Sequence, residues 1–124
     1  MMDVWIVTDR YESDCQMDIH LHMTPKGAYE KAFGILHELY GQLVDRDYDY
    51  DGDWNDPDRP LHGIEEEMAE GLNGKLLLSL VRSANYANAK LEDLQKVFQK
   101  FNCIIGEWTD WDNDVDIKQA RLSV

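Results

Sequence analysis

Residues 15–25 read Cys-Gln-Met-Asp-Ile-His-Leu-His-Met-Thr-Pro and contain a strand followed directly by the start of a helix. Apolar and polar side chains alternate from Cys15 to Met23, which is typical of a β-strand with one face buried and one face in water. Thr24 can then act as an N-cap, and Pro25 suits the first position of a helix. The stretch therefore predicts a strand whose polar side is wet, joined to a helix.

The neighbouring segments extend this unit in both directions. Residues 3–9, Asp-Val-Trp-Ile-Val-Thr-Asp, predict a short buried strand that pairs with residues 15–23 as a hairpin. After Pro25, apolar residues recur at helical spacing as far as about Arg46, so a long amphipathic helix is expected to lie across the sheet. The apolar stripe consists of Tyr29, Ala32, Phe33, Leu36, Leu39, Tyr40 and Leu43.

The second half of the chain completes an α+β pattern. Residues 64–72 predict a short acidic helix, and residues 75–82, Lys-Leu-Leu-Leu-Ser-Leu-Val-Arg, predict a third strand. Asn88 can cap a second amphipathic helix, and residues 103–109 and 115–122 predict a closing hairpin. We expect a single domain over residues 1–124: a two-layer α+β sandwich in which two amphipathic helices pack on a mostly antiparallel sheet of about five strands.

The net charge of −13 is concentrated in two segments. Residues 45–70, predicted as a long acidic loop, hold eleven acidic and two basic residues, and residues 107–116, predicted as an acidic hairpin turn, hold five acidic residues and no base. Direct binding to nucleic acid or to anionic lipid is not expected, because both would repel such a chain. The sequence also has no apolar run near the ~20 residues of a membrane span and no signal-peptide pattern at its start, so we expect a cytoplasmic protein.

The two cysteines are far apart in the sequence and form no Cys-x-x-Cys motif. Cys15 and Cys103 each lie in an apolar, strand-like run. We therefore expect both to be buried free thiols rather than a disulfide.

A regular acidic pattern lies between residues 47 and 58. Aspartates occupy its first, third and fifth positions, a glycine its sixth, an asparagine its ninth and an aspartate its twelfth: Asp47, Asp49, Asp51, Gly52, Asn55 and Asp58. This spacing resembles the calcium-binding loop of the EF-hand family, in which oxygen ligands surround a hard cation and the glycine permits a sharp turn. The pattern departs from the family at Asp58, where a bidentate glutamate is usual, and at Trp54. The resemblance implies a possible calcium site at Asp47, Asp49, Asp51, Asn55 and Asp58; no other cofactor is expected.

A second metal hypothesis concerns the polar side of the strand at residues 15–23. Asp18, His20 and His22 share that side, and a His-x-His pair on a strand can direct two nitrogens to one zinc ion. A solvated strand gives the same spacing without a metal. If the protein were a small metal-dependent enzyme, this face would be its expected site.

The acidic segments also carry aromatic residues, and this combination is typical of a protein-binding surface. Carboxylates steer a basic partner toward them, and aromatic rings hold its Arg and Lys side chains. We therefore expect a non-enzymatic interaction or inhibitor protein that binds a basic, nucleic-acid-handling protein by mimicking nucleic acid, as a phage-type anti-defence protein or an immunity protein would. The alternative is that the aromatics pack on the domain and the acids keep it soluble. The predicted partner-binding residues are Asp47, Tyr48, Asp49, Tyr50, Asp51, Asp53, Trp54, Asp56, Asp58, Trp108, Asp110, Trp111, Asp112 and Asp114.

Overall fold

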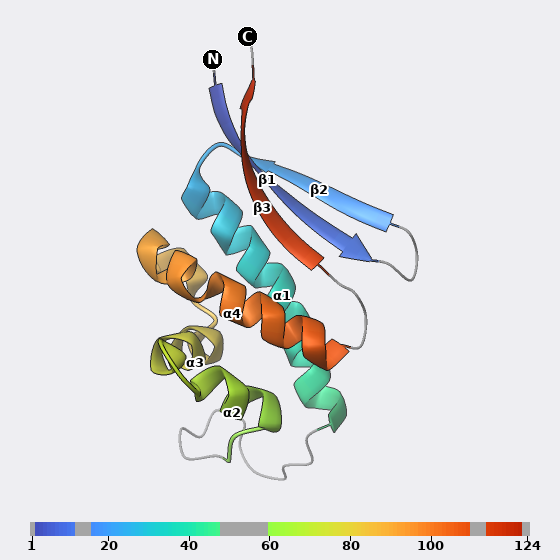
Figure 1. Ribbon diagram of the computed structural model, residues 1–124, viewed down its shortest axis with the longest axis vertical. Helices are drawn as coiled ribbons and strands as arrows, with labels where there is room; N and C mark the ends of the chain where they lie inside the picture. The colour runs from blue at the N-terminus through green and yellow to red at the C-terminus, as the bar shows by residue number, and fades with distance from the viewer. Residues whose placement is uncertain (1, 12–15, 48–59, 110–113, 123–124) are drawn as a thin grey trace.

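The computed structural model describes residues 2–11, 16–47, 60–109 and 114–122. These residues form an α+β structure with four α-helices and a three-stranded antiparallel sheet (Figure 1). The central strand, β1 (Met2–Tyr11), pairs with β2 (Gln16–His22) on one side and with β3 (Asp114–Leu122) on the other. The strands predicted at residues 3–9, 15–23 and 115–122 are thus confirmed.

The four helices lie on one side of the sheet. The first helix, α1 (Pro25–Asp47), contacts all three strands, and α4 (Leu91–Thr109) packs along α1. Beyond α4 lie α2 (Gly63–Ala69) and α3 (Gly74–Ser83), at the end of the molecule away from the sheet (Figure 1). A 3-10 turn, η1 (Tyr86–Asn88), connects α3 to α4.

Two of the five predicted strands are helical, so that part of the prediction is wrong. Residues 75–82 lie in α3, where Leu77 and Val81 are buried one helical turn apart. Residues 103–109 belong to α4, whose buried positions continue through Ile104 and Ile105. Asn88 is not the cap of α4, because it belongs to η1 and the first turn of α4 closes on the carbonyl of Lys90.

The acidic segments are also partly helical. Of residues 45–70, the first three end α1 and Gly63–Ala69 form α2, whereas residues 48–59 lie outside the described residues. Of residues 107–116, the first three end α4 and the last three begin β3. Among the described residues, no helix combines the length and the apolar content that a membrane crossing requires.

The core forms between α1, α4 and the sheet. Phe33 of α1 is fully buried, and its ring centroid lies 5.6 Å from that of Phe101 and 5.1 Å from that of Tyr86. From the sheet, Val7 and Val115 join the same cluster. The predicted cap of α1 is present, since Thr24 Oγ1 accepts a hydrogen bond from the Gly27 amide at 3.1 Å.

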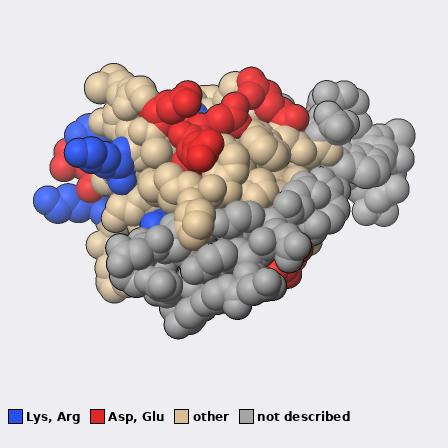
Figure 2. All heavy atoms as spheres, turned by 90° about the horizontal axis from the view of Figure 1, so that it is seen from below, with Lys and Arg blue, Asp and Glu red and all other residues tan. Residues whose placement is uncertain are grey.

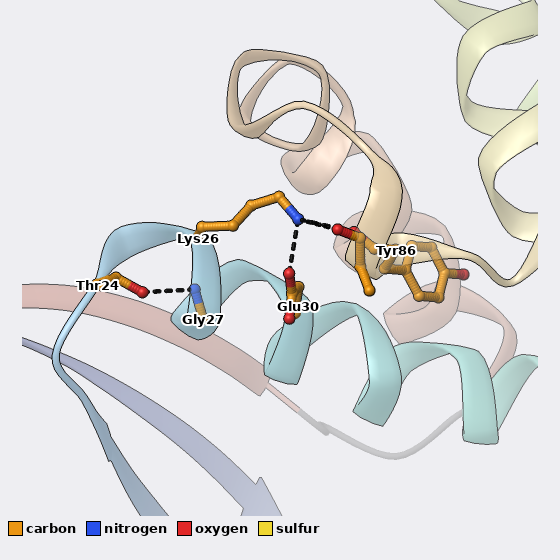
Figure 3. A network of polar contacts seen from close by, with 6 residues as sticks. Thr24, Lys26, Gly27, Glu30 and Tyr86 are labelled. Carbon is orange, nitrogen blue, oxygen red and sulfur yellow. Dashed lines mark hydrogen bonds and ion pairs between the residues drawn. The ribbon is translucent and has the colours of Figure 1, made fainter.

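A polar network attaches η1 to α1 (Figure 3). Lys26 Nζ donates to Glu30 Oε1 at 2.6 Å and to the main-chain carbonyls of Tyr86 and Ala87 at 2.9 and 3.0 Å. His37 lies one helical turn after Phe33 on α1, and its Nδ1 is 2.8 Å from the Tyr86 hydroxyl oxygen. Burial lowers the pKa of His37 below its ordinary value, and burial followed by the nearby Tyr40 raises the pKa of the Tyr86 phenol. Both side chains are therefore neutral at physiological pH.

The orientation of β2 differs from the prediction. Val7, fully buried against the helices, has His20 as its cross-strand neighbour, so the polar side of β2 must face α1. The apolar side faces away from the helices, and Ile19 and Leu21 are 61% and 64% exposed. This arrangement is possible because β2 is an edge strand, where polar side chains on the helix side can still reach water.

Cys103 also differs from its predicted state. It lies on the exposed side of α4 as a free thiol, because residues 103–109 are helical and the buried side of the helix is taken by Ile104 and Ile105. Cys15 lies outside the described residues.

Candidate interaction surface

The two acidic segments, far apart in the sequence, meet at Trp108. The indole Nε1 of Trp108, near the end of α4, donates a hydrogen bond to Glu67 Oε2 of α2. The Trp108 ring lies against the start of α2: its centroid is 5.5 Å from that of His62, and a Cβ added at Gly63 would lie 3.1 Å from the indole. The fold therefore packs the α2 part of one acidic segment against the α4 part of the other.

Carboxylates are displayed around this contact. Glu66 of α2 is exposed, and so are Glu70, which directly follows α2, and Glu107, which neighbours Trp108 on α4. We call the four carboxylates Glu66, Glu67, Glu70 and Glu107 the α2–α4 acidic surface. Figure 2, which views the molecule from below, shows a group of acidic side chains gathered together, while most of the basic side chains in this view lie at another edge, next to a further acidic side chain. Lys100, which donates to the main-chain carbonyl of Glu70, is a cation close to this surface.

Glu65 has a different role from the acids around it. Its side chain is fully buried, accepts a hydrogen bond from the His62 amide at 3.1 Å and lies 3.4 Å from Arg82 Nε. His62 Nδ1 in turn accepts from the Ile64 amide at 3.1 Å, so the two side chains form a capping box at the start of α2. The three-residue spacing between His62 and Glu65 is the sequence signature of a capping box, although histidine occupies the position where serine or threonine is usual.

Trp108 is a predicted partner-binding residue that the structure places at the edge of the core. It is partly buried, packs against the core cluster and donates to Glu67. Its indole therefore holds α2 against α4, and its exposed portion adds an aromatic edge to the α2–α4 acidic surface.

Other predicted site residues fall outside what the structure describes. Asp47 is the last residue of α1 and Asp114 the first of β3, but their side chains are not described. The remaining predicted partner or metal residues lie outside the described residues: Tyr48, Asp49, Tyr50, Asp51, Asp53, Trp54, Asn55, Asp56, Asp58, Asp110, Trp111 and Asp112.

A cleft of about 330 Å³ lies between the sheet and α1. Asp18 and His20 line it from β2, together with Asp9, which the sequence analysis did not single out and which is buried at the end of the predicted first strand. The helix side of the cleft is formed by Lys31, Ile35, Glu38, Leu39 and Gln42. His22 lies elsewhere, beside the start of α1, where a Cβ added at Gly27 would be 3.4 Å from its Nδ1. Within residues 2–11, 16–47, 60–109 and 114–122, no three His, Cys, Asp or Glu side chains are grouped so that they could hold a metal ion.

Comparisons with known proteins give no match: no protein-family profile fits the chain, and no curated protein or solved structure matches it.

Proposed function

We propose that the protein is a non-enzymatic interaction protein that binds a basic protein through the α2–α4 acidic surface and the acidic segments continuous with it. The observation that carries this proposal is the contact of Trp108 with Glu67, which brings together one residue from each of two sequence segments whose net charges are −9 and −5. A chain of net charge −13 destabilises its own compact state by repulsion. Concentrating the acidic residues in two segments increases this repulsion further, and binding of a partner rich in Lys and Arg would compensate for it.

The partner class follows from the same chemistry. Exposed carboxylates on two helices that contact each other present negative charge, as a phosphate backbone does, so the lysines and arginines of a nucleic-acid-binding groove are suitable counterparts. In an extended chain, the alternate aspartates Asp49, Asp51 and Asp53 would lie about 6.6 Å apart on one side, which adds to this likeness. Asp45 and Asp47 cannot join such a row, because both belong to α1. The biological settings that match are a phage-type inhibitor of a host nuclease and an immunity protein for a toxin.

Stopped-flow binding to a fluorescent oligo-arginine peptide tests this proposal. Changing one carboxylate from each segment, Glu66→Gln with Glu107→Gln, should weaken binding about tenfold, mainly through a slower association rate. The matched control, Glu38→Gln with Glu92→Gln, removes the same charge from exposed sites on α1 and α4. If both double variants lose the same affinity, binding responds to net charge alone and the proposed surface is wrong.

Calcium binding is a second candidate, supported by one observation. The α1 helix runs to Asp47, the first position of the EF-hand-like pattern, as an entering helix does in that family. Calorimetric titration of chelator-stripped protein with calcium should then give saturable micromolar binding and a higher Tm, and Asp51→Asn should abolish both. Weak heat that never saturates and that salt removes would contradict this candidate.

A further inference from the structure

The face of the sheet turned away from the helices carries several exposed apolar side chains. We call it the outer sheet face: it holds the even-numbered residues of β1 and β3, among them Val4, Ile6 and Thr8 of the central strand, and the odd-numbered residues of β2. In β2 and just after it, Ile19, Leu21 and Met23 are 61%, 64% and 60% exposed, and Met2 of β1 is 41% exposed. The helices lie on the opposite side of the sheet, so within the described residues no element covers this face (Figure 1).

Apolar residues on neighbouring strands lie next to one another on this face. Val4 is only 2% exposed although it is not part of the core cluster between the sheet and the helices. Its neighbour across the sheet is Ala120 of β3, and the adjoining pair is Ile6 with Lys118. Adjacent apolar side chains on three strands form a continuous patch, and patches of this kind mark interaction sites in soluble proteins.

The border of the patch carries both a positive and a negative side chain, so the same border on a second copy offers the opposite charges. Lys118 Nζ and Asp116 Oδ2 lie 3.7 Å apart and are 76% and 46% exposed. In a two-fold arrangement each side chain of such a pair can meet its opposite in the other copy, as an isologous interface requires. The α2–α4 acidic surface lies at the other end of the molecule, so its carboxylates are not part of this border (Figure 1).

We propose that a second copy of this chain covers the outer sheet face. The two sheets stack face to face about 10 Å apart, with strand directions within about 30°, as in a β-sandwich. Ile19, Leu21 and Met23 of the two protomers form the centre of the interface. At its border, Lys118 of each protomer lies against Asp116 of the other.

The size of the face sets the strength of the dimer. Three strands about 4.8 Å apart and about 30 Å long give a footprint near 400 Å² per copy, about half of the ~800 Å² per partner in a standard stable interface. We therefore expect a weak, reversible dimer whose population depends on concentration.

Sedimentation velocity of the full chain tests this inference. Between about 1 µM and about 500 µM, the weight-average mass should rise from 14.5 kDa toward twice that value. Leu21→Lys should keep the protein monomeric over this range. Leu72→Lys is the matched control, because Leu72 is 86% exposed and follows α2, away from the sheet, and it should leave the dimer intact. A wild-type monomer at all concentrations, or a dimer that Leu21→Lys does not weaken, would overturn the inference.

A charge exchange gives a second test that does not depend on the apolar residues. Lys118→Asp places like charges across the two-fold axis and should weaken self-association about tenfold, because it replaces two opposite-charge contacts with two like-charge contacts. Combining Lys118→Asp with Asp116→Lys restores opposite charges and should return the wild-type Kd. Both side chains are on the surface, so these variants retain the fold, as circular dichroism can verify. If the double exchange is as weak as the single one, the proposed pairing is wrong.

Discussion

Glu65 shows that neighbouring acids in one segment can have opposite roles. Its carboxylate is fully buried between the His62 amide and Arg82, whereas Glu66 beside it is exposed. Glu65→Ala should lower the free energy of unfolding by about 2–4 kcal/mol, because it removes the capping box and leaves Arg82 without its carboxylate. Glu66→Ala, the control, should change it by less than about 0.5 kcal/mol. Urea denaturation measures both, and equal losses would contradict the role given to Glu65.

His37 should make stability depend on pH near neutrality. Burial lowers the pKa of His37 in the folded state, so at a pH below its unfolded-state pKa of 6.5 the unfolded chain binds a proton at His37 more readily than the folded chain does. Stability is therefore complete above that pH and falls as the pH drops through 6.5 toward the folded-state pKa. In urea denaturation between about pH 7.5 and 5.5, His37→Gln should show a smaller fall than the wild-type protein. Parallel pH profiles for the two proteins would show that His37 does not contribute.

At the scale of elements, the sequence was sufficient where a periodic pattern was long. The helix from Pro25 and the strand at residues 15–23 each show several repeats of one period, and Thr24 marks a helix start with a known physical role. The run at residues 75–82 could not be assigned in this way, because its leucines fit both a buried strand and a helix. Leu77 and Val81 are buried one turn apart, a spacing visible only once the helix is known.

Long-range packing decided the remaining elements. In α4, Ile104 and Ile105 continue the helical spacing of the preceding core residues, but their β-branched side chains favoured a strand locally. In β2 the alternation was predicted correctly, but the side that faces the helices was predicted wrongly. His20 pairs with Val7 and therefore lies on the helix side, and this register is determined only in the folded sheet. Neither the packing of α4 nor the register of β2 can be inferred from local propensity.

The junction between α2 and α3 depends on a glycine at a close approach. A Cβ added at Gly74 would lie 2.1 Å from the carbonyl oxygen of Ala69. Gly74→Ala should therefore cost about 1–3 kcal/mol of stability through displacement of the backbone. Gly34, on the exposed side of α1 with no atom within 4 Å of its added Cβ, is the matched position, and Gly34→Ala should stabilise the protein by about 0.5–1 kcal/mol. Thermal or urea unfolding that gives the same sign for both would contradict this account.

At the scale of the whole molecule, the acidic segments were predictable from composition, but their contact was not. Trp108 and Glu67 are 41 residues apart in the sequence, and only the packing of α2 on α4 brings them together. The outer sheet face was hidden from the sequence for a related reason: alternation predicts two faces of a strand and does not tell which one the helices cover. The two surfaces lie at different ends of the molecule, so they can be tested separately.

Ionic strength should shift the two proposed associations in opposite directions. Binding of a basic partner to the α2–α4 acidic surface is attractive at long range, so raising salt from about 50 mM to about 500 mM should weaken it. Self-association brings together two chains of net charge −13 through an apolar face, so the same salt should strengthen it by screening their repulsion. Oligo-arginine binding and sedimentation velocity on one preparation measure both constants. If salt weakened both, the contact between copies would be mainly ionic and the apolar centre assigned to Ile19 and Leu21 would be wrong; if salt strengthened both, the acidic surface would not be the site of basic partners.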